Sequence, residues 1–122
     1  LDSADIQNVE FKLVAENSTP VSSELQIYFQ DDNGQTLDSL FTGGPRFIME
    51  AAPVDAQGVS TGVQRTENFV AMDIERFNVI RKAKKAYMTT SFTTAKGGTQ
   101  PVKLLATNST TVKMGLKVKT KL

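Results

Sequence analysis

Residues 112–122 read Val-Lys-Met-Gly-Leu-Lys-Val-Lys-Thr-Lys-Leu, and this alternation of apolar and basic residues decides the fold. Successive side chains of a β-strand point to opposite faces of its sheet, so one row should be buried and the other should face water. We expect Met114, Leu116 and Val118 to be buried. The lysines between them should be solvated, and a strand of this kind must pair with strands formed by earlier segments.

Several other short segments show the same period of two, which is typical of half-buried strands. Turn signals rich in Gly, Pro, Asn and Asp separate these segments, and residues 55–62 form the longest of the predicted loops. The expected strands cover residues 9–16, 24–30, 37–41, 46–52, 67–72 and 87–94, and residues 102–106 lead into the final strand. This pattern predicts an all-β fold, an antiparallel β-sandwich of about seven or eight strands, in a single domain over residues 1–122.

Asp31, Asp32, Asn33 and Gly34 form the clearest turn, and two registers are possible for the hairpin around it. A two-residue Asn33-Gly34 turn places Phe29 opposite Asp38. A three-residue loop with Gly34 in the left-handed conformation places Phe29 opposite Leu37 instead. Because the second register pairs two apolar residues, we favour it.

One segment, residues 74–85, has helical spacing, and Asp73 can cap its N-terminus. Apolar residues recur every three positions on one face, at Ile74, Phe77, Ile80 and Ala83. We expect Phe77 and Ile80 to cover an open end or face of the sandwich. The opposite face should be solvated and carries Glu75, Arg76, Asn78, Arg81, Lys82, Lys84 and Lys85.

The composition excludes several kinds of chemistry. The 122 residues include no Cys and no His, so disulfides, thiol nucleophiles, the Ser-His-Asp triad and most transition-metal sites have no residues to form them. No run of eighteen apolar residues suggests a transmembrane helix, and no charged-then-apolar leader opens the chain.

The net charge of +1 hides a segregation along the chain. All thirteen acids lie at or before Glu75 with only three bases, a balance of −10, whereas residues 76–122 hold eleven bases and no acid. One interpretation is that the fold brings the two halves together so that their fields cancel. The other is a dipolar particle with an acidic and a basic face, suited to head-to-tail contacts or to anionic partners.

Neither the acidic turn nor the remaining carboxylates predict a catalytic or metal site. Asp31 and Asp32 have the oxygen-rich look of a calcium loop, but the Glu that completes such a loop is missing, so a plain turn is favoured. Glu16, Glu24 and Asp38 could supply a carboxylate pair, yet solvated strand faces explain them better. No phosphate-binding glycine loop precedes a helix. We therefore predict no catalytic residue, no metal and no cofactor.

The basic residues of the second half are the candidate partner-binding residues. Nucleic acid is disfavoured as the partner because base-stacking aromatics are not interleaved with them and the acidic half would repel phosphate. We expect a protein partner or self-association instead. The candidates are Lys113, Lys117, Lys119 and Lys121 of the final strand with Arg81, Lys82, Lys84 and Lys85 of the helix end.

The chain resembles uncharacterised all-β domains of exported proteins from the Bacteroidota. The resemblance lies in residues 9–17, Pro20, 25–31 and 37–41, and it continues in residues 51–58, 83–85 and 112–122. The strand-Asn-x-x-Pro-strand opening is also similar to late-embryogenesis-abundant-type sandwich domains. The first resemblance implies a periplasmic, outer-membrane-associated or cell-surface module. Since the chain has no Cys for a lipid anchor, attachment to the outer membrane would come through another part or another protein.

Three classes of function stay open. The first is a noncatalytic structural or interaction module of an exported bacterial protein, self-associating or docking through its segregated acidic and basic faces. The second is a sandwich that binds a small apolar ligand or a glycan, with Tyr28, Tyr87 and the loop at 55–62 as candidates. The third is an enzyme, which would need a carboxylate or metal mechanism without His or Cys.

Overall fold

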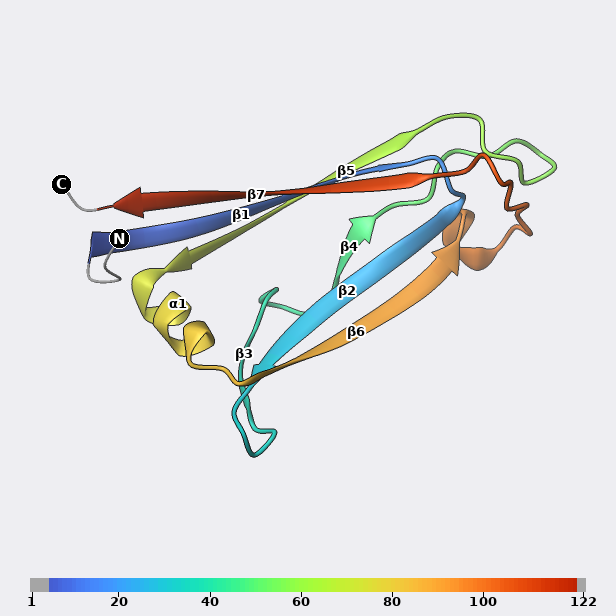
Figure 1. The fold of residues 1–122 in the computed structure, drawn as a ribbon. Helices are drawn as coiled ribbons and strands as arrows, with labels where there is room; N and C mark the ends of the chain where they lie inside the picture. The colour runs from blue at the N-terminus through green and yellow to red at the C-terminus, as the bar shows by residue number, and fades with distance from the viewer. Residues whose placement is uncertain (1–4, 121–122) are drawn as a thin grey trace.

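The computed structural model describes residues 5–120, which form two antiparallel sheets and one α-helix (Figure 1). In the β1 sheet, β1 (Ile6–Asn17) lies between β5 (Gln64–Asp73) and β7 (Thr110–Thr120). In the β2 sheet, β2 (Val21–Gln30) pairs with β6 (Lys85–Thr94) along one edge and with β3 (Thr36–Ser39) and β4 (Arg46–Met49) along the other. The predicted all-β antiparallel sandwich is confirmed.

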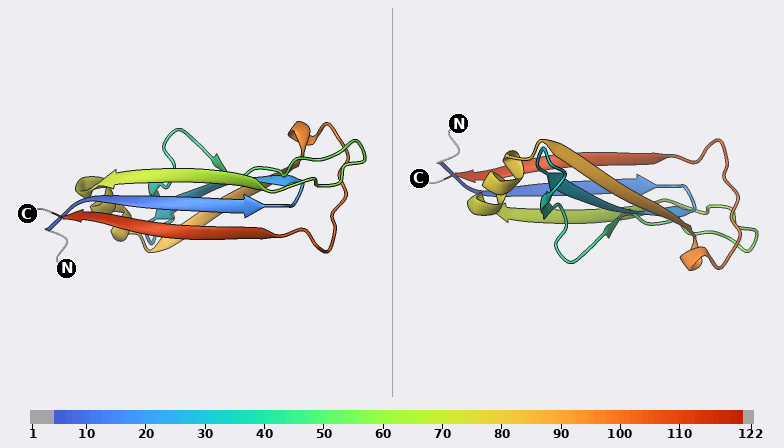
Figure 2. Two further views of the ribbon diagram at one scale, coloured as in Figure 1. Left: turned by 90° about the horizontal axis from the view of Figure 1, so that it is seen from above. Right: turned by 90° about the horizontal axis from the view of Figure 1, so that it is seen from below.

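The two sheets converge at one end and splay apart at the other, where α1 (Ile74–Arg81) lies (Figures 1 and 2). The long connection from β6 to β7, which includes the 3₁₀ helix η2 (Lys96–Gly98), belongs to the convergent end. No helix in residues 5–120 has the length and apolar character needed to cross a membrane. The sandwich is therefore a wedge with α1 in its mouth.

Buried Asn17 joins the strands at the convergent end. Its Nδ2 donates to the carbonyl oxygens of Thr19, Val21 and Glu50, at 2.9, 3.1 and 2.9 Å. Its Oδ1 accepts from Thr19 N and from Thr110 Oγ1, the latter at 2.7 Å. One fully buried amide thus joins the start of β2, the end of β4 and the start of β7, and buried backbone groups need such partners.

The sandwich is closed along one of its long sides by bonds between β4 and β5. Arg46 Nη1 donates to the Phe69 carbonyl at 3.1 Å, and Asn68 Nδ2 donates to the Phe47 carbonyl at 2.8 Å. The opposite long side is bounded by the edge strands β6 and β7, which are not paired with each other. We call this the open side.

The core is small and lies between the sheets, close to α1. Phe41, Val70 and Met72 are its buried centre, and Leu25 of β2 and Ile80 of α1 pack against it. Three residues at the centre of a core give little redundancy, so each large side chain there carries a substantial share of the stability.

Two local predictions need correction. Phe29 lies opposite Asp38, not Leu37, because the pairing shifts by one residue between Phe29 and Gln30. Gly34 is left-handed as expected, with φ of 78°. The helix ends at Arg81, four residues before the predicted end, because the Lys84 N–H already donates to the Gln30 carbonyl and Lys85 begins β6.

Candidate functional site

An apolar pocket of about 330 Å³ lies between the two sheets. Every residue that lines it is apolar, and the lining comes from four strands, from α1 and from Leu40. The lining residues are Phe11, Leu13, Leu25, Ile27, Phe29, Leu40, Val70, Met72, Phe77, Ile80 and Met114. The expectation that Phe77 and Ile80 cover the sandwich is met, since they form the pocket wall at its splayed end.

The predicted burial of the final strand is wrong, although its pairing is correct. β7 pairs with β1 along its whole described length, with Leu116 opposite Phe11 and Val118 opposite Val9. Met114, Leu116 and Val118 therefore point inward, yet they are 71%, 62% and 39% exposed. They are exposed because the β2 sheet does not extend over β7, so the inward row borders the open side.

The inward row of β6 is exposed in the same way. Met88 lies opposite Ile27, a pocket residue, and Phe92 lies opposite Ser23 on the same face of β2. Their exposed fractions are 61% and 66%. The exposed apolar residues of these two rows border the open side, and Met114 also lines the pocket. We call the pocket together with these residues the apolar groove; its exposed apolar residues are Met88, Phe92, Val112, Met114, Leu116 and Val118.

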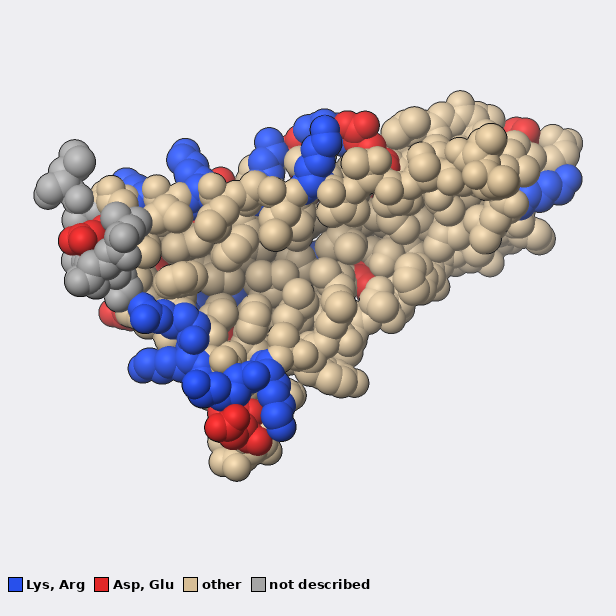
Figure 3. All heavy atoms as spheres, viewed as in Figure 1, with Lys and Arg blue, Asp and Glu red and all other residues tan. Residues whose placement is uncertain are grey.

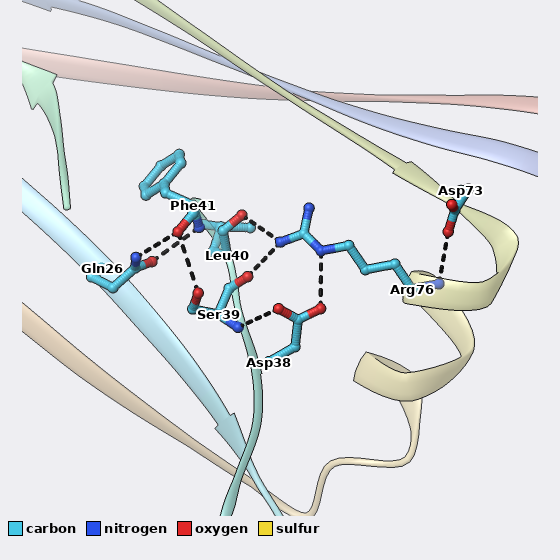
Figure 4. A network of polar contacts seen from close by, with 7 residues as sticks. All are labelled: Gln26, Asp38, Ser39, Leu40, Phe41, Asp73 and Arg76. Carbon is cyan, nitrogen blue, oxygen red and sulfur yellow. Dashed lines mark hydrogen bonds and ion pairs between the residues drawn. The ribbon is translucent and has the colours of Figure 1, made fainter. Parts of the chain in front are cut away.

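Arg76 holds α1 at the mouth of the groove (Figure 4). Its Nε donates to Asp38 Oδ2 at 2.9 Å, and its Nη2 donates to the carbonyls of Ser39 and Leu40. Asp73 caps the same helix by accepting from Arg76 N at 2.8 Å. The predicted solvated position of Arg76 is wrong, because its guanidinium reaches back over β3 and is largely shielded.

The candidate partner-binding residues fall into two groups. Lys113, Lys117 and Lys119 alternate with the inward row of β7 and therefore lie on the outer face of the β1 sheet. The second group, Arg81, Lys82, Lys84 and Lys85, is exposed at the end of α1 and the start of β6. Figure 3 shows the surface between β7 and β6 as largely uncharged. Lys121 lies outside the described residues.

The acidic and basic halves of the chain are interleaved in the fold. Lys117 of β7 lies directly opposite Glu10 of β1, and Arg76 pairs with Asp38. This arrangement favours the interpretation in which the two halves offset each other within one molecule.

Three of the acidic candidates, Asp31, Glu16 and Asp38, have structural partners. Asp31 Oδ1 accepts from the N–H groups of Asn33 and Gln35, so this carboxylate fixes the turn. Glu16 and Asp38 pair with different arginines, Arg65 and Arg76. Among residues 5–120, no group of three or more acids is placed to hold a metal ion.

A pKa shift is found at the exposed end of β5. The hydrogen bond from Arg65, with the nearby charge of Lys12, holds the pKa of the Glu67 carboxyl below its usual value. The same bond raises the pKa of the Arg65 guanidinium. Both side chains face solvent on the outer surface of the β1 sheet, so this pair belongs to a charged surface and not to the groove.

The two tyrosines lie away from the groove. Tyr28 and Tyr87 are cross-strand partners with ring centroids 6.4 Å apart. Because Ile27 and Phe29 face the pocket, Tyr28 between them faces the other side of the β2 sheet. The loop at 55–62 lies at the convergent end, so these ligand candidates do not form one site with the pocket.

Comparison with family models, with curated proteins and with solved structures finds no match to this chain. The resemblance to exported Bacteroidota domains therefore stays a prediction.

Proposed function

We propose that this chain is a noncatalytic interaction module that binds a protein partner through its open side. The observation that carries the proposal is the apolar groove, where the inward rows of β6 and β7 are exposed on either side of an apolar pocket. Exposed apolar residues gathered beside an apolar pocket are costly to leave in water and commonly mark an interaction site. Binding a partner there would bury it.

The position of the groove also indicates how the charged residues would contribute to binding of the partner. Interfaces commonly have an apolar centre and a polar rim, and the rim chiefly affects association rate and specificity. Lys113, Lys117 and Lys119 lie on the outer face of β7, beside the groove, where they would form such a rim. Docking through the two charged faces alone has less support, since acids and bases are interleaved on the β1 sheet.

The setting of the module is a separate part of the proposal. The resemblance to exported Bacteroidota domains supports a periplasmic, outer-membrane-associated or surface location. Fractionation of the native host, with an antibody raised against this chain, would test it. Recovery in the cytoplasm would contradict the exported setting and would leave the proposed interaction through the groove unaffected.

Panning a random peptide display library against the immobilised chain tests the interaction function. A double variant, Phe92→Glu with Leu116→Glu, places charge in the groove at two residues that are already exposed, so it should fold. We expect peptides that are enriched on the natural chain and not on the variant. Val63→Glu is the matched control, because Val63 is as exposed as Leu116, at 63% against 62%, and lies outside the groove. Equal enrichment on all three proteins would contradict the proposal.

A second function, binding of a small apolar ligand, is favoured by the purely apolar lining of the pocket. At about 330 Å³ its volume is at the low end of ligand sites. A fluorescent fatty acid titrated into the chain would saturate at one site and lose affinity in Ile80→Trp, which fills the pocket. Unsaturable binding, or binding unaffected by Ile80→Trp, would exclude this alternative.

A further inference from the structure

We propose that the partner is an extended peptide segment that adds to the free edge of β7 as a further strand. Its large apolar side chains would alternate with acidic ones, the apolar row entering the apolar groove and the acidic row facing the lysines of β7. This inference rests on the proposed function and names the chemistry of the partner.

One edge of β7 is free in the part of the chain that the structure describes. Within residues 5–120, β7 pairs only with β1, so its other edge presents unpaired N–H and C=O groups from Thr110 to Thr120. A long edge strand is a template for another strand, and peptide recognition by strand addition uses such edges. On the other long side, the bonds from Arg46 and Asn68 to the backbone of the facing strand tie β4 to β5. The open side lacks this closure among the described residues.

The natural partner of β7 shows which sequence fits it. On its paired edge, β7 faces the apolar residues Val9, Phe11, Leu13 and Ala15 of β1, opposite Val118, Leu116, Met114 and Val112. On the other face of the same pairing, Glu10 lies opposite Lys117. Side chains directly opposite each other in antiparallel strands interact, so a strand on the free edge faces the same two rows.

The lysines of β7 indicate which residues the outer row of the partner should carry. Lys113 lies opposite Val14, and Lys119 lies opposite Asn8, so neither has an acid directly across the β1 pairing. No ion pair within 4.0 Å joins either lysine to an acid in the described part of the chain. An added strand with Glu or Asp on its outer face would supply these partners.

The same charges disfavour a second copy of β7 as the added strand. If two β7 strands paired antiparallel about Leu116, Lys113 of each copy would lie opposite Lys119 of the other. Like charges directly opposite each other are destabilising. The row of lysines therefore selects an acidic strand over self-pairing.

The test uses a labelled peptide whose sequence is that of residues 9–16 of β1 with Lys12→Glu and Val14→Glu, which reads Val-Glu-Phe-Glu-Leu-Glu-Ala-Glu. One control peptide has Lys in place of every Glu, and another has the same composition with apolar and acidic residues in separate blocks. Fluorescence anisotropy measures binding to the full chain at low and high salt. We expect the alternating acidic peptide to bind at least about tenfold more tightly than either control, a difference of about 1.4 kcal/mol. Its affinity should fall as salt rises.

Variants of the chain test the apolar row and the lysine row of β7 one at a time. Leu116→Glu should weaken binding of the acidic peptide by about tenfold or more, and Val63→Glu should not. The double variant Lys113→Glu with Lys119→Glu should bind the acidic peptide more weakly and the lysine peptide more tightly than the natural chain does. Lys96→Glu with Lys103→Glu, the same charge change in the β6 to β7 connection, should leave both affinities unchanged. Hydrogen exchange with bound peptide should show new protection at alternate amides of β7.

Several results would overturn the inference. They are absence of binding by the acidic peptide, equal binding of all three peptides, and bound peptide without new protection in β7. A chain that dimerises through β7, with dimers lost in Leu116→Glu, would make a second copy the occupant. If panning enriches groove-dependent peptides of another pattern, the interaction function stands and the strand-addition inference fails.

Discussion

Replacing Arg76 by Met should loosen the helix that forms the mouth of the groove. Met keeps much of the apolar stem of Arg and removes the guanidinium that contacts Asp38, Ser39 and Leu40. The carboxylate of Asp38 and two backbone carbonyls then lose a charged donor. Since the helix spans only Ile74–Arg81 and buries none of its residues completely, it has few other contacts to hold it.

The size of the expected loss in stability follows from the burial of the Arg76–Asp38 pair. Side-chain exposures of 20% for Arg76 and 24% for Asp38 place the pair between a surface and a buried ion pair. Exposed pairs contribute about 0 to 1 kcal/mol, and breaking a buried pair costs about 3 to 5 kcal/mol. We expect Arg76→Met to lower the free energy of unfolding by about 2 to 3 kcal/mol, because the lost carbonyl bonds add to the lost pair.

Urea denaturation followed by circular dichroism measures this cost. A double-mutant cycle with Asp38→Asn isolates the pair and should give a coupling of about 1 to 2 kcal/mol. Arg81→Met is the matched control on the same helix, since the exposed Arg81 only reaches Asn78 at 3.5 Å, and it should cost less than about 0.5 kcal/mol. Arg76→Met at the same small cost as Arg81→Met would refute the role assigned to the network. An apolar dye should also bind the Arg76→Met protein more strongly if the mouth of the groove opens.

Three further outcomes are expected. Met72→Ala should cost about 2 to 5 kcal/mol in urea denaturation, whereas Leu116→Ala should cost less than about 1 kcal/mol because its side chain is exposed; equal costs would mean that β7 is covered in solution. Asn17→Ala should lower stability by more than about 2 kcal/mol, since three partly buried carbonyls lose their donor, and a loss below about 0.5 kcal/mol would contradict the junction described. The depressed pKa of Glu67 means that its bond with Arg65 stabilises the fold above the unfolded carboxyl pKa of about 4.3 and is lost as pH falls through the lower folded value. Thermal melts of Glu67→Gln and the natural chain should therefore differ at pH 7 and converge near pH 3; a gap that widens toward acid would reverse the assignment.

The strands and their facing could be predicted from the sequence because a period of two is a local property. The alternation at 112–122 correctly predicted a strand that pairs along its described length, with Met114, Leu116 and Val118 on one face. It could not give burial, because burial depends on whether another sheet lies over that face.

Helix features were predicted where they depend on neighbours in sequence. Asp73 caps α1 as expected, and Phe77 and Ile80 face the pocket. Arg76 was missed because helical spacing assigns it to the solvated face, while its long side chain reaches a strand segment 38 residues earlier in the sequence. The sequence around Arg76 carries no signal for this contact, because the contact depends on how the fold brings β3 beside α1.

The hairpin and the candidate site show the same limit. Pairing Leu37 with Phe29 was reasonable by hydrophobicity, but Asp38 lies at that position and pairs with Arg76, a tertiary contact. The apolar groove could not be recognised from its residues, because the alternation predicts a buried Met114 and no local signal sets Met88 or Phe92 apart from core residues. What distinguishes them is the absence of a covering strand among the described residues.

The position of β1 has a consequence for the order of folding. β1 is central in its sheet, yet its partner β7 lies far along the chain, with Asn17 and Thr110 separated by 93 residues. Contacts of such long range close slowly, because the loop entropy is lost before the contacts form. Until β7 arrives, Phe11 and its neighbours form an unpaired apolar edge without the lysines that β7 later supplies. A partly folded chain in which β7 has not yet docked is then more prone to aggregate than the folded domain, and conditions that speed the docking of β7 should raise the yield of soluble protein.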